Sequence, residues 1–270
     1  MAQVLQVKIL GSGCSTGVPR IDGYWGACDP ENPKNRRSRC SAWFGLYDQA
    51  RPESMTSVVI DTSPDFRDQM IRAKVTNIDA VLWTHDHADQ THGLDDMRAF
   101  TFKRDTPIDG YADQATMDTL ARRFGYVFKG NLGYPPVCEP HLIPPHGQPW
   151  SVAGEGGALP IVTFDQEHGP IRSVGYRIGD VAYSSDISNM PEDSFAALRN
   201  LKVWIVDCLR YKPHPTHSHL EKTLEWIRRV RPERAILTNL HQDLDYKTLQ
   251  AQLPEGVEPA YDQIGFEINL

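Results

Sequence analysis

The chain has 270 residues, 40% of them hydrophobic and 23% charged, so it can bury a substantial core and has the composition of an ordinary globular protein. Its 28 basic and 35 acidic side chains give a formal net charge of −7, which argues against nucleic acid as a constitutive partner. No apolar run approaches membrane-spanning length, and residues 1–10 lack the features of a signal peptide, so we expect a cytoplasmic protein without a membrane partner.

Strand-like and helix-like segments alternate along the chain, and no linker-like change in composition interrupts them. The first half predicts strands at residues 4–10, 41–46, 57–60 and 78–83, and helices at 64–71 and 117–128. The stretch 130–157, rich in Pro, Gly and His, predicts a long loop or a small insertion. The second half predicts strands at 160–164, 173–178, 181–185, 202–207, 234–237 and 265–270, with helices at 220–230 and 245–253. We therefore expect one α/β domain, residues 1–270, made of two similar halves.

The stretch "THDHADQTHG" follows one of the predicted strands and holds His85, His87 and Asp89 at alternate positions. Further candidate ligands follow later strands: His168, Asp186 and His241. Loops at strand ends hold the backbone while leaving side chains open, which is where an α/β scaffold places reactive groups. Imidazole nitrogen and carboxylate oxygen suit zinc, manganese or iron, so the pattern predicts a metal site. The isolated histidines are expected to be surface or core residues: His141, His146 and His214.

These motifs resemble those of the metallo-β-lactamase superfamily. "THDHADQTHG" is similar to its HxHxDH signature, and "DQEHG", "YSSDIS" and "TNLHQDLDY" follow in the order of its later ligands. "GSGCSTGVPR", "RRSRCS" and "IDTSPDFR" resemble the branch that includes the carbon–phosphorus lyase accessory enzyme, a cyclic phosphodiesterase. The resemblance implies a four-layer αββα sandwich with metals in a cleft at one edge of the two sheets.

The resemblance also implies roles for individual residues. It places His85, His87 and His168 at a first metal, Asp89 and His241 at a second, and Asp186 between the two metals. It makes Asp89 a candidate to orient the attacking water, and Asp61 a carboxylate that orients a ligand imidazole. "PTHSHL" matches the segment where this branch keeps a catalytic histidine, which implies His217 as catalytic and its neighbour His219 as substrate-binding; an exposed helix start is the alternative.

The chain departs from the family pattern in two places. Gln90 occupies the position of the fourth clustered ligand, and two positions further on His92 is expected to point to a different side. The neutral amide oxygen of Gln90 is a weaker ligand than imidazole, so we expect one tight metal site and one weaker, exchangeable site. The five cysteines are scattered without CxxC spacing, and only Cys28 lies where the accessory enzyme builds a structural zinc, so we expect neither a disulfide framework nor that zinc.

The chemistry expected from such a site is phosphodiester hydrolysis. A metal pair holds a nucleophilic hydroxide and neutralises phosphoryl charge, and His217 supplies the proton that the leaving alkoxide needs. Arg37 belongs to a basic run, residues 34–39, that could bind substrate phosphate, although a solvated loop explains the run equally well. The glycine-rich "GSGCSTG" does not match a nucleotide-binding fingerprint and is expected to shape the cleft floor.

Three functions remain open. The first is a zinc- or manganese-dependent phosphodiesterase acting on a small or cyclic nucleotide or sugar phosphate. The second is a ribonuclease of the tRNA 3′-processing type, against which the net acidity counts. The third is a non-catalytic accessory protein of the same fold, such as the one involved in making pyrroloquinoline quinone. The sequence leaves the metal, the substrate and the oligomeric state open, a homodimer included.

Overall fold

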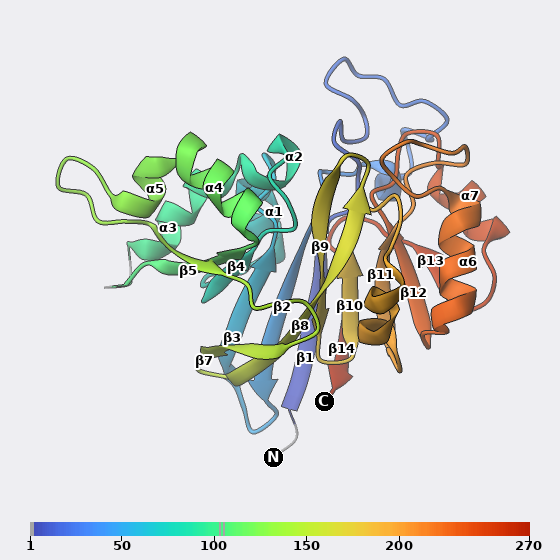
Figure 1. Ribbon diagram of the computed structural model, residues 1–270. Coiled ribbons are helices and arrows are strands. Elements are labelled where there is room, and N and C mark those ends of the chain that lie inside the picture. The colour runs from blue at the N-terminus through green and yellow to red at the C-terminus, as the bar shows by residue number, and fades with distance from the viewer. Residues whose placement is uncertain (1–2, 103, 105) are drawn as a thin grey trace.

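The computed structural model describes residues 3–102, 104 and 106–270 of the chain. Two seven-stranded sheets lie face to face at its centre (Figure 1). The first sheet has the strand order β14-β1-β2-β3-β4-β5-β6, and the second has the order β13-β12-β11-β10-β9-β8-β7. The strands of the first sheet are β1 (Gln3–Gly11), β2 (Ser41–Asp48), β3 (Arg51–Ile60), β4 (Ala80–Leu82), β5 (Ile108–Ala112), β6 (Cys138–Leu142) and β14 (Gly265–Asn269). Those of the second sheet are β7 (Pro149–Gly154), β8 (Gly157–His168), β9 (Ile171–Ile178), β10 (Val181–Ser184), β11 (Val203–Asp207), β12 (Arg234–Thr238) and β13 (Val257–Pro259).

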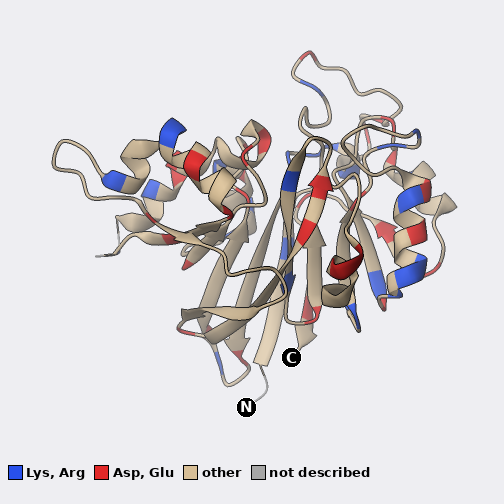
Figure 2. Cartoon of the chain, in the orientation of Figure 1, with Lys and Arg blue, Asp and Glu red and all other residues tan. Residues whose placement is uncertain are grey.

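Helices cover the outer face of each sheet, so that they lie on opposite sides of the molecule (Figure 1). They are α1 (Phe66–Ala73), α2 (Ala88–Thr91), α3 (Arg98–Thr101), α4 (Gln114–Arg123), α5 (Gly125–Lys129), α6 (Leu220–Val230) and α7 (Tyr246–Gln252). Short 3₁₀ helices lie at Pro33–Asn35, Leu94–Met97 and Glu192–Leu198. None of the helices in the described part of the chain has the length and apolar content needed to cross a membrane. Lys and Arg are interspersed with Asp and Glu along α6 (Figure 2), as on an ordinary solvated surface.

Three apolar clusters join the four layers. The largest fills the space between the sheets, a second lies between the first sheet and α1 and α4, and a third lies between the second sheet and α6 and α7. β11 shows how one strand serves two of these interfaces, because successive side chains point to opposite faces. Val203 and Ile205 pack between the sheets, while Trp204 and Val206 pack toward the helices. The predicted αββα sandwich is confirmed.

Several details of the predicted elements are wrong. The stretch 130–157, expected to be a long loop or a small insertion, contains β6 and β7, the end strands of the two sheets. The helix expected at 117–128 is two helices, because the backbone leaves the helical region at Phe124, with φ −126° and ψ 34°. β5 and β13 were not anticipated, and β8 continues beyond the predicted 160–164 to His168.

The polar residues of interest gather at one edge of the two sheets. β3, β4, β5 and β6 are parallel to one another, as are β10, β11, β12 and β13, so within each group the carboxyl ends meet at one edge. Three residues that follow these strands have left-handed backbones: Asp61 (φ 62°), Asp186 (φ 55°) and Asn239 (φ 61°). Non-glycine residues adopt this conformation at a cost that surrounding contacts must offset, and such positions cluster at functional sites.

Candidate metal centre

His85 is held as a neutral imidazole with one nitrogen free to bind a metal. Asp61 accepts hydrogen bonds from the Thr84 main-chain N–H (2.8 Å) and from the Thr84 hydroxyl (2.9 Å to Oδ2). Because that hydroxyl donates to Asp61, it accepts from His85 Nδ1, 3.0 Å away. Nε2 is therefore unprotonated, and it is buried without a hydrogen-bond partner among the described residues. Burial lowers the pKa of His85 to about 3, which keeps the ring neutral. Asp61 thus acts on the imidazole through Thr84.

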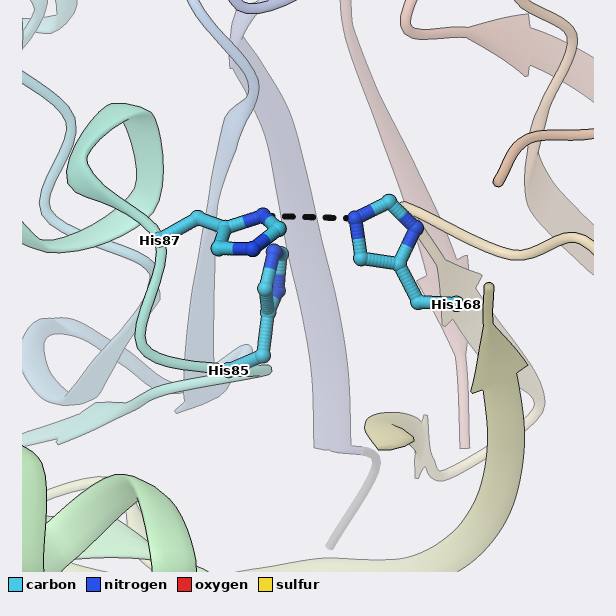
Figure 3. Close-up of side chains that lie close together, drawn as sticks. All are labelled: His85, His87 and His168. Carbon is cyan, nitrogen blue, oxygen red and sulfur yellow. Dashed lines mark hydrogen bonds between the residues drawn. The ribbon is translucent and has the colours of Figure 1, made fainter. Parts of the chain in front are cut away.

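His85, His87 and His168 form a cluster of three imidazoles (Figure 3). Their ring centroids lie 4.6 to 5.0 Å apart, and His87 Nδ1 lies 3.3 Å from His168 Nε2. His168 Nδ1 donates to the Thr216 carbonyl oxygen at 2.7 Å, which leaves Nε2 as the nitrogen with a lone pair, facing His87. One ligand atom from each ring lies within 4.8 Å of the other two, close enough for a single ion to contact all three.

Asp186 adds a carboxylate to this cluster. Its Oδ1 lies 3.8 Å from His168 Nε2, while its Oδ2 accepts from Ser185 Oγ at 2.7 Å. Burial alone would raise its pKa, but the neighbouring imidazoles of His217, His85 and His168 hold it at about 2, so the group is ionised. Three imidazole nitrogens and one carboxylate oxygen are a donor set suited to zinc, and the unpartnered Nε2 of His85 fits it. These residues would hold the first metal of the sequence prediction.

The residues expected at a second metal are arranged differently. Asp89 Oδ2 accepts from Gln90 Nε2 at 3.1 Å, and burial together with the Asp186 carboxylate raises the pKa of Asp89 to about 6. His241 Nδ1 lies 3.3 Å from Asp243 Oδ2. Within the described residues, neither Asp89 nor His241 belongs to a group of three ligand atoms within 4.8 Å of one another. Of the six predicted ligands, His85, His87 and His168 form one group and Asp186 belongs to a second group with His168 and His217; Gln90 links Asp89 to Asp186, and among the described residues His241 belongs to neither group.

His217 lies beside the histidine cluster and is paired with a buried aspartate. Its Nδ1 is 3.1 Å from Asp207 Oδ2, and its ring centroid is 4.7 Å from that of His168. Burial alone would lower the pKa of His217, but Asp207, Asp186 and Asp89 outweigh burial and raise it to about 9. The imidazole is thus protonated at neutral pH, with Nδ1 facing Asp207 and Nε2 as the other proton carrier.

Asp207 was missed in the sequence, although it ends β11 as His168 ends β8. It is fully buried, and its Oδ2 also accepts the Ile187 main-chain N–H at 3.0 Å. The signal that could have identified it is an aspartate closing the apolar run "VWIVD".

Other histidines lie outside the cluster. His219 directly precedes α6, where its main-chain oxygen accepts from Thr223, and its side chain is half-buried. His92 packs edge-on against Phe124, with ring centroids 5.4 Å apart, so it is no replacement for a ligand at position 90. His141 is paired with Asp109, and His146 contacts Thr163.

The prediction that Arg37 binds substrate phosphate is wrong, because its guanidinium is buried and already bonded. Only 2% of the residue is exposed. The guanidinium donates to the main-chain oxygens of Leu244 (2.7 Å) and His241 (3.3 Å) and to Asn35 Oδ1 (3.2 Å). Arg37 therefore holds the loop that carries His241 against the N-terminal loop.

Asp262 makes a second connection of this kind. One carboxylate oxygen accepts from Ser12 (N at 3.0 Å, Oγ at 2.9 Å) and the other from Ser38 (N at 2.8 Å, Oγ at 2.7 Å). Asp262 thus joins the segment that follows β13 to the segment of Ser12 and Ser38 near the start of the sequence.

Arg37→Met should lower the free energy of unfolding by roughly 2–4 kcal/mol, because two buried carbonyl oxygens lose their donors. Urea unfolding followed by circular dichroism measures this loss. Arg36→Met is the matched control, since Arg36 is exposed and lies over the Trp25 ring. Equal stability of the two variants would show that the buried bonds of Arg37 contribute little.

Comparison with known proteins agrees with the geometry. A sequence model described as the beta-lactamase superfamily domain matches residues 56–239. A solved structure of a diphosphatase from the PhnP family is 32% identical to this chain, with 100% of this chain and 99% of the diphosphatase aligned and a TM-score of 0.85.

Other similar proteins are more distant or longer. Zinc-bound PqqB from Methylobacterium extorquens is 16% identical over 97% of this chain and 99% of its own, with a TM-score of 0.73. The short form of human tRNase Z is 15% identical over 97% and 98% of the two chains, with a TM-score of 0.67. Both share the fold. An octanoyltransferase of Porphyromonas gingivalis is 32% identical over 272 residues, which cover 97% of this chain, but this chain spans only about half (52%) of that protein. The predicted family is confirmed: the chain belongs to the metallo-β-lactamase superfamily, in the branch that includes the PhnP-family diphosphatase.

Proposed function

We propose that this protein is a metal-dependent phosphodiesterase that hydrolyses a small or cyclic nucleotide or sugar phosphate. The observation that carries the proposal is two groups of possible ligands that share His168, one with His85 and His87 and one with Asp186 and His217, together with the raised pKa of His217. The combination provides a place for a divalent ion next to a proton donor, which are the two requirements of phosphodiester hydrolysis. The similarity to a diphosphatase of the PhnP family supports the same class of substrate.

The first metal, zinc or manganese, would be held by the three histidines and Asp186. When bound, it supplies a Lewis acid that neutralises phosphoryl charge and activates water. Asp89, His241 and Asp186 would form a second and weaker site. Of the chain's own groups, Thr84 and the Thr216 carbonyl oxygen fix the tautomers of His85 and His168, so each ring presents an unprotonated nitrogen to the ion.

His217 is the proton donor of the proposed reaction. Asp207 holds its Nδ1, which leaves Nε2 to protonate the leaving alkoxide. Asp89 would accept a hydrogen bond from the attacking water and orient it. His219, two residues after His217 in the sequence, is proposed to contact the phosphate of the substrate.

A panel of substrates tests the proposal. We expect the purified protein to hydrolyse bis(p-nitrophenyl) phosphate and at least one of a set of cyclic nucleotides, sugar phosphodiesters and diphosphate esters. Activity should disappear with a chelator and return with zinc or manganese. Release of p-nitrophenol and chromatography of the nucleotide products provide the measurements.

Two results would support the alternatives. Cleavage of a tRNA precursor with no turnover of small phosphodiesters would favour the ribonuclease. Tight metal binding without hydrolysis of any member of the panel would favour the non-catalytic accessory protein.

A further inference from the structure

Gln90 lies between two carboxylates at the edge of the histidine cluster. Its Nε2 is 3.1 Å from Asp89 Oδ2 and 3.1 Å from Asp186 Oδ2. The residue is fully buried. Its main chain is held on both sides, because its N–H donates to the His87 carbonyl oxygen (3.1 Å) and its carbonyl oxygen accepts from the Thr62 N–H (2.8 Å). The amide group therefore occupies a defined position between Asp89 and Asp186.

The chemistry of the amide fixes which of its ends faces the carboxylates. Ionised carboxylates only accept hydrogen bonds, and the NH₂ group has two N–H donors, one for each of them. Gln90 Oε1 is consequently directed elsewhere, and it is buried without a partner among the residues that the structure describes. An amide nitrogen has no lone pair to offer a metal, so in this arrangement Gln90 is not a ligand.

The space between two carboxylates is also where a second divalent ion would bind. Asp186 and Asp89 are both predicted ligands of that ion, and a cation between them would replace the two N–H donors of Gln90. The Nδ1 of His241, the third predicted ligand, lies 3.3 Å from Asp243 Oδ2, and among the described residues no group of three ligand atoms includes His241 or Asp89.

We infer that the N–H donors of the Gln90 amide take the place of a second metal ion between Asp89 and Asp186. The centre therefore binds only one ion tightly. A second ion binds only by displacing the amide from Asp89 and Asp186. The inference rests on the proposed function for the identity of the first metal site, and it identifies Gln90 as the residue that sets the metal stoichiometry.

The opposite possibility is that Gln90 is a poor ligand that binds a second ion through Oε1. Gln90→Met separates the two, because methionine keeps the length of the side chain but has neither N–H donors nor an amide oxygen. If the amide competes with the ion, Gln90→Met strengthens binding of the second ion. If the amide oxygen binds the ion, the same substitution weakens binding of the second ion.

The experiment is a manganese titration by calorimetry of the full chain loaded with one metal per molecule, with metal content checked by mass spectrometry. For the natural protein we expect one ion retained through desalting. Gln90→Met should bind a second ion about tenfold or more tightly than the natural protein, since two hydrogen bonds to charged groups no longer have to be broken. Gln90→His, which adds a ligand, should retain two ions. His92→Gln is the control, because His92 packs on Phe124, and its stoichiometry should equal that of the natural protein.

Two outcomes would overturn the inference: two equally tight ions in the natural protein, or weaker binding of the second ion by Gln90→Met. The titration uses no substrate, so it is independent of whether the protein is a phosphodiesterase. A protein that binds one ion as described but hydrolyses no phosphodiester would contradict the proposed function and leave the inference intact.

Discussion

His217→Ala should lower the turnover of a phosphodiester with a poor leaving group by roughly 10²–10⁴, while the first metal stays bound. The imidazole is protonated at neutral pH, because the paired Asp207 and the nearby Asp186 and Asp89 outweigh the effect of burial and raise its pKa to about 9. An alkyl alkoxide is a strong base and cannot leave efficiently without that proton. Steady-state kinetics with an alkyl phosphodiester, together with metal analysis of the variant, provide the measurement.

An activated aryl ester is the matched control, since p-nitrophenolate leaves without protonation and the same variant should lose much less activity on it. Asp207→Asn adds a second readout. The pKa of His217 is raised in the folded protein, so activity that needs its proton is present at neutral pH and lost as the pH rises through that pKa. Removing the Asp207 charge should move this alkaline limb to lower pH. Unchanged activity of His217→Ala on the alkyl ester, or loss of the first metal, would contradict its assignment as the acid.

His168→Ala should reduce both metal content and phosphodiester turnover, the latter by roughly 10³ or more, because the bound ion contributes several kcal/mol of transition-state stabilisation. His168 Nε2 lies 3.3 Å from His87 Nδ1 and 3.8 Å from Asp186 Oδ1, so it is the ligand that joins the other imidazoles to the carboxylate. Metal content by mass spectrometry and kcat on bis(p-nitrophenyl) phosphate are the measurements.

His146→Ala is the control for this loss. His146 Nδ1 lies 3.2 Å from Thr163 Oγ1, and His146 belongs to no cluster of ligand atoms in the described residues. The His146→Ala variant should keep its metal and its activity. A His168→Ala variant that retained a full equivalent of metal would show that the first site is built from other residues.

Local sequence patterns predicted those site residues that lie close together in the sequence. His85 and His87 stand at alternate positions after an apolar strand, and that spacing alone indicated a metal site. His168 and Asp186 follow other strands far along the chain; their strand-end positions made them candidate ligands, and the family resemblance assigned them to particular metals. Asp207 closes the apolar run "VWIVD", which marks it as a strand-end carboxylate but does not reveal that it faces a histidine ten residues later.

Which polar side chains are buried was the property hardest to predict from the sequence. Arg37 was read as part of a basic run on a loop, but a run of charges does not show which member turns inward. β6 and β7 were missed for a related reason, because each is the last strand of its sheet. An edge strand tolerates proline, and Pro140 and Pro149 made these segments look like a loop.

The hydrogen bonds of Arg37 and Asp262 have a consequence for the order in which contacts form during synthesis. The N-terminal loop that carries Ser12, Arg37 and Ser38 is made early on the ribosome, but its partners are residues 241, 244 and 262. Chains generally begin to fold from the N-terminus during synthesis. Until these residues have emerged, the guanidinium and hydroxyl groups of this loop lack these partners and stay in water. The full set of hydrogen bonds that ties the loop of residues 12–38 to the segment 241–262 therefore forms only after residue 262 has been synthesised.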